Sequence, residues 1–277
     1  MKKNKLVAPV LKWAGGKRQL LGAVRPLLPK EITTYCEPFG GGALLFQLQP
    51  ATAFINDINA ELINVYQAIK DDVEGLINAL RKFKNEEDMF YSVRDWDRNK
   101  KQYASLSYIE KAARILYLNK TCYNGLFRVN SAGEFNTPFG NYRNPNIVNA
   151  PTLRAVSAYF NSADVRLTSV DYAKVLKSLP KNTFVYLDPP YGPVSDTSSF
   201  TGYSKGGFTR DDQIRLRKCC DELDSKGLKF MLSNSATDFI KEQYAAYHIA
   251  IARAKRAINS NCAKRGEIDE VTVRNYQ

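Results

Sequence analysis

The stretch Thr183-Phe-Val-Tyr-Leu-Asp-Pro-Pro-Tyr191 decides how the rest of the chain is interpreted. Its β-branched and aromatic residues are typical of a short buried strand. The two prolines that follow can neither extend a ladder nor enter a helix interior, so the strand must stop at Asp188. Ligands of open α/β sheets bind beyond the carboxyl ends of the strands, and Asp188 is therefore expected at the edge of a binding site.

The residues at this strand end suit a planar base that carries an exocyclic amine. The Tyr191 ring can stack on such a base, while the Asp188 carboxylate and the Pro189 carbonyl can each accept a hydrogen bond from its N–H groups. Pro190 stiffens the backbone between them. The alternative is an ordinary turn after a core strand, because Asp-Pro often opens turns and Pro-Pro marks loops.

The charge balance of the chain favours a polyanionic partner. Its 277 residues include 40 Lys and Arg against 28 Asp and Glu, which gives a net charge of +12. Basic side chains displace counterions from phosphates, so nucleic acid is the first candidate and an anionic membrane surface the second. The length suits one large domain, or a main domain with a smaller one.

Cysteine, histidine and apolar residues exclude several classes of protein. The five cysteines are odd in number and lack C-x-x-C spacing, as expected of reduced thiols in the cytosol. The single histidine, His248, leaves no histidine cluster for zinc, and we expect it to be structural. No apolar stretch has the length of a membrane span, and the N-terminal one is too short for a signal peptide. We therefore expect no metal, no membrane contact and a cytoplasmic location.

Glycine-rich turns near the N-terminus indicate a nucleoside site. The segment 35–46, which contains Gly40-Gly41-Gly42, predicts a strand, a tight turn and an apolar helix. A second predicted strand ends at Asp57, about twenty residues on, where nucleotide-binding folds place a carboxylate for ribose hydroxyls. G-x-G-x-x-G spacing is absent, so an adenosine without a diphosphate fits better. The alternative is a fold without a cofactor, which can carry the same pair of features.

A second glycine pair lies in Lys12-Trp-Ala-Gly-Gly-Lys17, before a predicted helix. Exposed N–H groups and lysines make it a candidate anion site, although Gly-Gly-Lys is also an ordinary turn. Residues 118–143 then combine Lys, Arg and Asn with aromatic residues. Arg suits guanine edges, Asn suits adenine and aromatic rings act as wedges, so this region is a candidate base reader. The alternative is a loop with scattered polar residues.

After residue 151 the chain returns to an α/β alternation. Asp171 and Tyr172 follow a predicted strand, where they would face an adenine or form a helix N-cap followed by a core tyrosine. The segment Gly192–Gly207 is rich in Ser, Thr and Gly and predicts a lid over the site. The strands predicted in this half are Val165–Val170, Thr183–Asp188, Lys229–Asn234 and Val271–Val273.

Five motifs, taken in this order, resemble the Dam family of adenine-N6 DNA methyltransferases of the D12 class. They are Lys-Trp-Ala-Gly-Gly-Lys, Glu-Pro-Phe-Gly-Gly-Gly, Asn-Asp, Tyr-Asn-Gly-Leu-Phe-Arg-Val-Asn and Asp-Pro-Pro-Tyr. The likeness runs from Leu11 nearly to the C-terminus. It implies a Rossmann-like α/β methyltransferase domain, residues 1–65 and 150–277, with a smaller helical target-recognition domain, residues 66–149, inserted. The implied methyl donor is S-adenosylmethionine, and the implied product is S-adenosylhomocysteine.

The resemblance also implies roles for the matching residues. Those implied to bind the cofactor are Trp13, Ala14, Lys17, Glu37, Pro38, Phe39, Gly40, Asp57, Asp171, Tyr172 and Asp188. Those implied in catalysis are Asp188, Pro189, Pro190 and Tyr191. Those implied to contact DNA are Lys12, Lys120, Tyr123, Asn124, Leu126, Arg128, Pro138 and Tyr142. The implied site is GATC, with Lys12 and Arg128 on guanines, and Lys120 replaces an arginine of some members.

Elementary chemistry indicates how such a site would act. The lone pair of an exocyclic adenine amine is delocalised into the ring, and two hydrogen-bond acceptors would favour the pyramidal, nucleophilic form. Because N6 is paired inside a duplex, the adenine must be flipped out. We expect a monomer on double-stranded DNA, nucleoid-associated, and related to any restriction endonuclease only through a shared site. The alternatives are methylation of RNA or of a protein glutamine, and a non-catalytic DNA-binding module.

Overall fold

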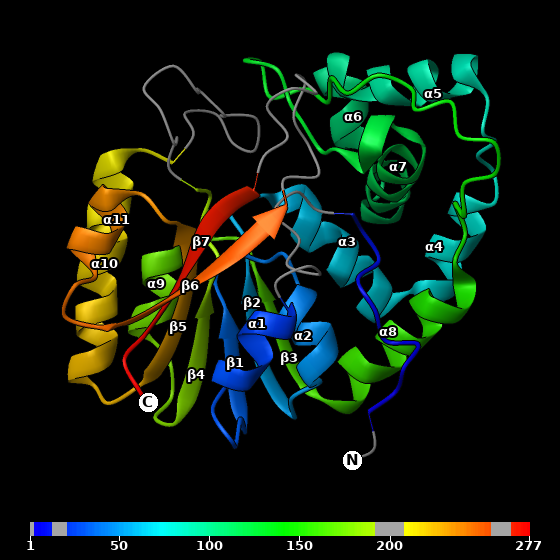
Figure 1. Ribbon diagram of the computed structural model, residues 1–277. Coiled ribbons are helices and arrows are strands. Elements are labelled where there is room, and N and C mark those ends of the chain that lie inside the picture. Colours follow the sequence, from blue (N-terminus) through cyan, green and yellow to red (C-terminus); the bar gives the residue numbers. More distant parts are fainter. Residues whose placement is uncertain (1–2, 13–20, 192–207, 256–266) are drawn as a thin grey trace.

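The computed structural model describes residues 3–12, 21–191, 208–255 and 267–277 (Figure 1). Three kinds of predicted feature lie outside these residues. They are the cofactor residues Trp13, Ala14 and Lys17, the lid at 192–207, and Cys262. The four cysteines inside the described ranges are buried free thiols.

A mixed sheet of seven strands forms the centre of the described chain, in the order β3-β2-β1-β4-β5-β7-β6 (Figure 1). Neighbouring strands are parallel from β3 to β5, and β7 runs antiparallel to both β5 and β6. The strand order reverses between β1 and β4, which is where α/β sheets bind ligands. This architecture confirms the predicted α/β methyltransferase fold class. The strands are β1 Thr34–Glu37, β2 Thr52–Asn56, β3 Asp164–Thr168, β4 Thr183–Leu187, β5 Lys229–Ser235, β6 His248–Lys255 and β7 Glu267–Arg274.

Alternate residues of the central strands supply two hydrophobic cores. In β4, Phe184 and Tyr186 pack into one core, and Val185 and Leu187 pack into the other. All five residues of β4 are buried, as expected of a parallel strand that is covered on both faces. The strand therefore ends with its backbone fixed, directly before Asp188.

Helices cover both faces of the sheet (Figure 1). Helices α9, α10 and α11 pack against one face, and α2, α3 and α8 pack against the other. The α-helices are α1 Leu21–Val24, α2 Ala43–Leu48, α3 Ala60–Asp71, α4 Val73–Leu80, α5 Glu87–Arg94, α6 Lys100–Ser105, α7 Tyr108–Thr121, α8 Ala150–Ser162, α9 Tyr172–Lys177, α10 Arg210–Ser225 and α11 Asp238–Gln243. The 3-10 turns are η2 Arg25–Leu27, η3 Asp95–Arg98 and η4 Tyr123–Gly125.

Helices α4 to α7 lie beside the sheet and share a core with it. Phe90 and Leu116 from these helices belong to the same buried cluster as Tyr35 and Phe46. The predicted domain boundary at residue 66 lies within α3, and the second boundary coincides with the start of α8. The division of the chain into two domains stays a prediction.

Two local features differ from the sequence-based expectation. The helical spacing of the apolar residues Ile58, Leu62, Val65 and Ile69 predicts that all four lie on one helix face, but Ile58 is 64% exposed. The Asn59 side chain accepts hydrogen bonds from the N–H groups of Glu61 and Leu62, so α3 begins at Ala60 and leaves Ile58 in the preceding loop. Strand β6 was not predicted, because its alanines and basic residues have low β propensity.

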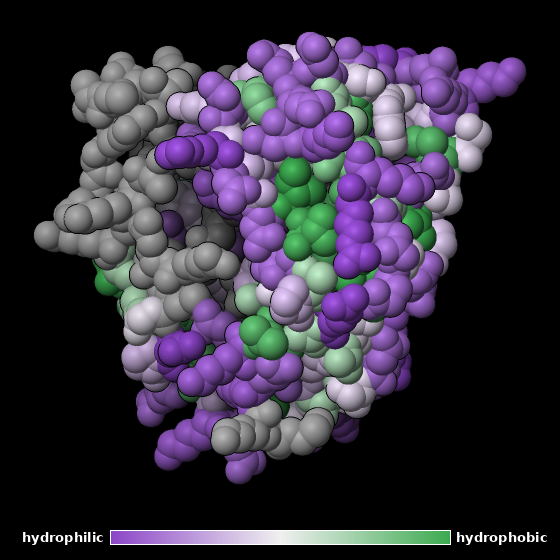
Figure 2. Space-filling model, turned by 90° about the vertical axis from the view of Figure 1, so that its right-hand side faces the viewer, coloured by the Kyte–Doolittle hydropathy of each residue, from purple (hydrophilic) through white to green (hydrophobic). Residues whose placement is uncertain are grey.

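The outer surface of the helices is mainly polar. Figure 2 shows the side that lies to the right in Figure 1, where hydrophilic side chains surround a small hydrophobic group near the centre. None of the helices within the described ranges combines the length and the apolar character that crossing a bilayer requires.

Candidate active site

Three acidic residues gather where the parallel strands end. Glu37 is the last residue of β1, and Asp57 and Asp188 directly follow β2 and β4. Strand β1 pairs with both β2 and β4 in parallel register, so these three strand ends share one edge of the sheet. Asp188 is half-buried, and its charge contributes to the raised pKa of Glu37. The sequence-predicted carboxylates therefore come together at the point where the strand order reverses.

Glu37 is a buried carboxyl group with two donors fixed on it. The Tyr35 hydroxyl donates to Oε2 at 2.7 Å, and the Gly42 N–H donates to Oε1 at 2.6 Å. Only 2% of the residue is exposed, and this burial raises the pKa of Glu37 to about 7 despite both hydrogen bonds. Ionised Glu37 is thus costly in the free protein, and a cation beside it would lower that cost.

Asp57 is held in the loop between β2 and α3. Its Oδ2 accepts from the Gly40 N–H at 3.0 Å, and its Oδ1 accepts from the Asn59 N–H at 2.7 Å. Burial raises the pKa of Asp57 to about 6. A Cβ atom at Gly40 would lie 3.0 Å from the Asn56 carbonyl oxygen, so only glycine lets the turn after β1 approach β2 this closely.

Asn56 joins the ends of three strands, a role that the sequence analysis missed. It is 1% exposed, and its Nδ2 donates to the carbonyls of Pro38 and Val170 at 3.1 and 2.9 Å. Its Oδ1 accepts from the Val170 N–H at 3.0 Å and from the Thr168 hydroxyl at 2.9 Å. The available signal was an asparagine at the last position of an otherwise apolar strand, directly before Asp57.

Asp171 and Tyr172 form a helix N-cap followed by a buried tyrosine, which was the second of the two arrangements that the sequence predicts. Asp171 caps α9 through the Ala173 N–H at 3.0 Å, and Arg215 donates to both of its oxygens at 2.8 and 2.7 Å. The Arg215 guanidinium lowers the pKa of Asp171. The Tyr172 ring lies 5.1 Å from the Phe39 ring, and its buried hydroxyl has no hydrogen-bond partner among the described residues. Adenine contact by this pair stays a prediction.

The predicted base-reading residues between Tyr123 and Tyr142 lie on one loop after α7, which we call the base-reading loop. The Tyr123 N–H donates to the Pro138 carbonyl at 2.9 Å, and a bridge pairs Val129 with Phe135, which brings the two arms of the loop together. Tyr123 is 55% exposed and Tyr142 is 38% exposed. The predicted residues Asn124, Leu126 and Arg128 lie on the first arm, and Arg128 is exposed.

Arg128 is fixed by the opposite arm of this loop. Its Nε donates to Asn136 Oδ1 at 2.8 Å, and the Asn136 N–H donates to the Arg128 carbonyl at 3.0 Å. The arms are themselves supported by a buried ion pair, in which Arg114 contacts Asp97 at 2.7 Å and Asp97 accepts from the Phe135 N–H at 2.8 Å. The many charged residues around Asp97 in the sequence predict a solvated surface, but Asp97 is 7% exposed because the Arg114 guanidinium neutralises its charge and the Phe135 N–H donates to it.

Lys12 reaches the base-reading loop through Asn119, which the sequence analysis did not select. The Asn119 side chain accepts from the Lys12 N–H at 2.8 Å and donates to the carbonyls of Lys12 and Gly125 at 2.9 and 3.0 Å. Asn119 is 2% exposed. The N-terminal segment is thereby joined to the end of α7, and contact of Lys12 with DNA stays a prediction. The sequence feature that could have indicated this role of Asn119 is a polar residue at the end of a long apolar helix face.

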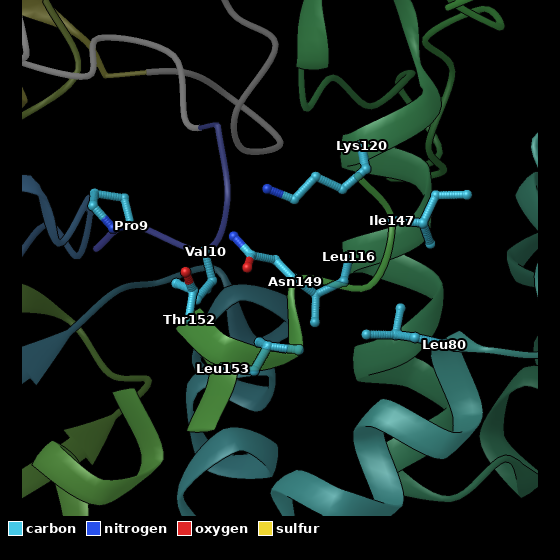
Figure 3. A pocket seen from close by; sticks show the side chains of 9 residues that line it. All are labelled: Pro9, Val10, Leu80, Leu116, Lys120, Ile147, Asn149, Thr152 and Leu153. Carbon is cyan, nitrogen blue, oxygen red and sulfur yellow. The ribbon is translucent and has the colours of Figure 1, made fainter. Parts of the chain in front are cut away.

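A separate small cavity lies among the N-terminal segment, α4, α7 and α8 (Figure 3). Lys120 from α7 and Asn149 extend towards it, and Val10, Leu80 and Leu153 line its apolar side. Its volume of about 20 Å³ is of the order of one water molecule. It is too small for a nucleoside, so the strand ends remain the candidate site.

No group of three or more His, Cys, Asp and Glu side chains within the described ranges is arranged to hold a metal ion.

Comparison with known proteins identifies the family of the chain. Residues 13–258 match the D12 class of N6 adenine-specific DNA methyltransferases. The chain belongs to this family. D12-class membership makes it an adenine-specific DNA methyltransferase, and it implies the use of S-adenosylmethionine.

Relatives of this D12-class enzyme match it over nearly their whole length. It is 43% identical to the type II methyltransferase M1.LlaDCHI of Lactococcus lactis subsp. cremoris over 280 residues, which cover 100% of this chain and 98% of that relative. It is 42% identical to the type II methyltransferase M.MjaIII of Methanocaldococcus jannaschii, with 98% and 99% covered. It is 32% identical to the DNA adenine methylase of Escherichia coli strain K12, with 98% and 95% covered. The predicted family is confirmed.

Proposed function

We propose that this D12-class enzyme methylates N6 of an adenine that is flipped out of duplex DNA, within the sequence GATC. The observation that carries the proposal is the position of Asp188-Pro189-Pro190-Tyr191 at the end of β4, beside Glu37 and Asp57. A half-buried carboxylate, a backbone carbonyl and an aromatic ring there match the edge and face of an adenine.

Asp188 and the Pro189 carbonyl would hold the N6 amine by accepting its two hydrogens. Two acceptors draw the N–H bonds out of the ring plane and free the nitrogen lone pair. The Asp188 carboxylate would stabilise the positive charge that develops on N6 as the methyl group arrives, and the methylated N6 would then release one proton to solvent. Tyr191 would stack on the base and replace the neighbours that the adenine loses when it leaves the duplex.

The residues around the strand ends fit S-adenosylmethionine, which supplies an electrophilic methyl group on a sulfonium centre. Asp57 offers a carboxylate to the ribose hydroxyls, and Glu37 offers a buried carboxyl group to a cation. The ring of Phe39 adds an apolar face, and the Tyr172 hydroxyl, which has no hydrogen-bond partner among the described residues, adds a polar atom. The remaining proposed cofactor contacts are Pro38, Gly40, Asp171 and Asp188, with Trp13, Ala14 and Lys17 from the segment outside the described residues.

The base-reading loop and Lys12 would recognise the GATC sequence in the DNA. Arg128, fixed by Asn136, and Lys12, fixed by Asn119, are proposed to contact the guanines through major-groove acceptors. The exposed ring of Tyr123 is proposed as the wedge that enters the space of the flipped base. The further proposed DNA contacts are Lys120, Asn124, Leu126, Pro138 and Tyr142.

One experiment tests this function directly. The protein is incubated with labelled S-adenosylmethionine and a GATC duplex, a scrambled duplex, RNA or a protein substrate, and the labelled product is identified. We expect N6-methyladenine in the GATC duplex alone. Label on RNA or glutamine would replace the proposal, and label only on DNA without GATC would leave the family intact and overturn the site.

Further proposals concern the setting of the enzyme. We propose that it acts as a monomer in the cytoplasm, on the nucleoid, and that it shares nothing with a restriction endonuclease beyond a recognition site. We also propose a target-recognition domain at residues 66–149. Sedimentation of the enzyme with one GATC duplex tests the first proposal, and a 2:1 complex would contradict it.

A further inference from the structure

The Tyr191 side chain is anchored at its far end by a residue outside the motifs. Its hydroxyl donates to Glu270 Oε2 at 2.6 Å. Glu270 lies on β7, opposite Ser235 in the ladder between β5 and β7. A short hydrogen bond to a carboxylate is one of the stronger kinds, so this contact fixes the tip of the ring.

The backbone that leads into Tyr191 is anchored separately. The carbonyl of Pro190 accepts a hydrogen bond from Gln213 Nε2 on α10 at 3.1 Å. Gln213 is 2% exposed, and its Oε1 accepts from Asn234 Nδ2 at 3.0 Å. Asn234 is fully buried, and its own Oδ1 accepts from the Ser235 N–H at 2.8 Å. This chain of bonds gives Gln213 one consistent orientation, with its N–H₂ group facing Pro190.

The two anchors together leave the ring little freedom. The pyrrolidine ring fixes φ of Pro190, and the bond from Gln213 fixes the direction of its carbonyl, which sets where the chain enters Tyr191. With the backbone fixed, the position of the Tyr191 hydroxyl determines χ1, and χ2 only turns the ring about the axis that ends at this hydroxyl. The place of the ring and the direction of its long axis are therefore set before any base arrives.

We propose that Glu270 and Gln213 are positioning residues that hold the Tyr191 ring ready to stack on the flipped adenine. The inference rests on the proposed function of the Asp188–Tyr191 segment. A ring whose position is already fixed loses less conformational entropy when the base binds. More of the stacking free energy is then left to hold N6 against Asp188. Glu270 contacts the Tyr191 hydroxyl and Gln213 contacts the carbonyl of the preceding Pro190, and both act on the base through the Tyr191 ring.

The test compares Glu270→Ala, Glu270→Gln, Tyr191→Phe and the double variant Glu270→Ala/Tyr191→Phe. A GATC duplex with 2-aminopurine at the target adenine reports base stacking by fluorescence, and single-turnover methylation of the natural duplex reports the rate. We expect Glu270→Ala and Tyr191→Phe each to slow methylation about tenfold, to change the 2-aminopurine signal and to leave the Kd for S-adenosylmethionine within about twofold. Glu270→Gln, whose amide oxygen still accepts from the hydroxyl, should recover most of the rate.

The double variant decides whether Glu270 acts through Tyr191. If it does, the double variant is no slower than Tyr191→Phe alone, because the contact is already lost. Asp269→Ala is the matched control, since Asp269 is the adjacent exposed carboxylate on β7, and it should keep the wild-type rate. Additive losses in the double variant, or an equal loss in Asp269→Ala, would overturn the inference.

Gln213→Glu provides an independent arm. It keeps the size of the side chain but replaces the N–H₂ donor that faces the Pro190 carbonyl, and we expect a loss of rate and a change of the 2-aminopurine signal similar to those of Glu270→Ala. A wild-type rate for Gln213→Glu would contradict its part in the anchor. If the wild-type enzyme methylates no DNA, the proposed function fails; if it methylates GATC and these variants keep their rates, only the positioning role fails.

Discussion

The strand-end site and the base-reading loop are built in different ways. At the strand ends, Glu37 and Asn56 are almost fully buried, and each has hydrogen bonds on both of its terminal side-chain atoms. On the base-reading loop, Tyr123 and Arg128 are exposed, and Arg128 is tied down mainly by Asn136. Under the proposed function, the reaction that needs a fixed geometry lies at the strand ends of the sheet, and the recognition of a DNA sequence lies on a surface that meets its partner in water.

This difference predicts that substitutions in the two regions have different kinds of effect. Changes at the strand ends should alter the reaction on every DNA, whereas changes on the loop should alter which DNA is chosen. The predictions below test that division in order of expected size.

Asp188→Ala should have the largest effect. Removing the carboxylate that is proposed to hold N6 should slow methyl transfer at least about 10³-fold on every duplex, while the Kd for S-adenosylmethionine changes only a few-fold. Single-turnover assays and equilibrium binding measure the two quantities. Asp164→Ala, at an exposed carboxylate that starts β3, is the control and should keep its rate. Substantial activity of Asp188→Ala on duplex DNA would sink the assignment of this residue.

Glu37→Gln should stabilise the free protein, with a pH dependence that identifies the cause. The folded pKa of about 7 lies above the ordinary value of 4.5, so folded Glu37 keeps its proton to a higher pH than the unfolded chain does. Stability of the wild type is therefore lost as pH rises from 4.5 to 7, and Gln removes this loss. We expect no difference near pH 4 and a gain of up to about 3 kcal/mol above pH 7.

Denaturant unfolding across this pH range measures the gain, with Glu87→Gln on the exposed first turn of α5 as the control. Glu37→Gln should at the same time weaken cofactor binding, because the carboxylate that is proposed to face a cation is gone. A variant that is less stable than the wild type at pH 8 would contradict the burial account of Glu37.

Arg128→Ala should relax the choice of site. Loss of a guanidinium from a guanine edge should cost about 2 kcal/mol on the GATC duplex and almost nothing on a duplex whose matching guanine is already replaced. Competition between the two duplexes measures this change. Arg81→Ala, at an exposed arginine that bonds to Asn78, controls for the loss of one positive charge and should lower binding to both duplexes alike or not at all.

Asn119→Ala should give the smallest of these effects. It removes the hydrogen bonds that join Lys12 to α7 and to Gly125, and we expect about tenfold weaker binding of GATC duplex, close to 1.4 kcal/mol. Asn161→Ala is matched to it, since Asn161 also donates to carbonyls from the end of a helix but lies on α8. Equal losses of DNA binding in the two variants would show that Asn119 only supports the fold.

Much of the fold around the strand-end site could be predicted from the sequence. The apolar run before Asp188 predicted β4, and the glycines before Asp57 predicted a close approach of two strand ends, because both depend on local preferences of the chain. The start of α3 was misplaced at Ile58, since the cap at Asn59 overrode the apolar spacing. Strand β6 was missed because its pairing with β7, and not its own residues, makes it a strand.

The supporting residues of the site could not be predicted in the same way. Glu270 contacts Tyr191 across 79 positions of sequence, Gln213 contacts Pro190 across 23, and Asn119 contacts Lys12 across 107. Such contacts depend on how the helices and strands pack, and no local pattern marks them. Asp97 looked like a surface charge for the same reason, since its partner Arg114 lies on another helix.

The most direct test measures single-turnover methylation by Asp188→Asn and Arg128→Ala side by side, on the GATC duplex and on each of its single-base variants. We predict that Asp188→Asn lowers the rate on all duplexes by a similar factor and keeps their order. Arg128→Ala should instead lower the rate on GATC far more than on the variants at its guanine. A change of site preference in Asp188→Asn, or an equal loss of rate on all duplexes in Arg128→Ala, would contradict the separation of catalysis at the strand ends from sequence recognition on the loop.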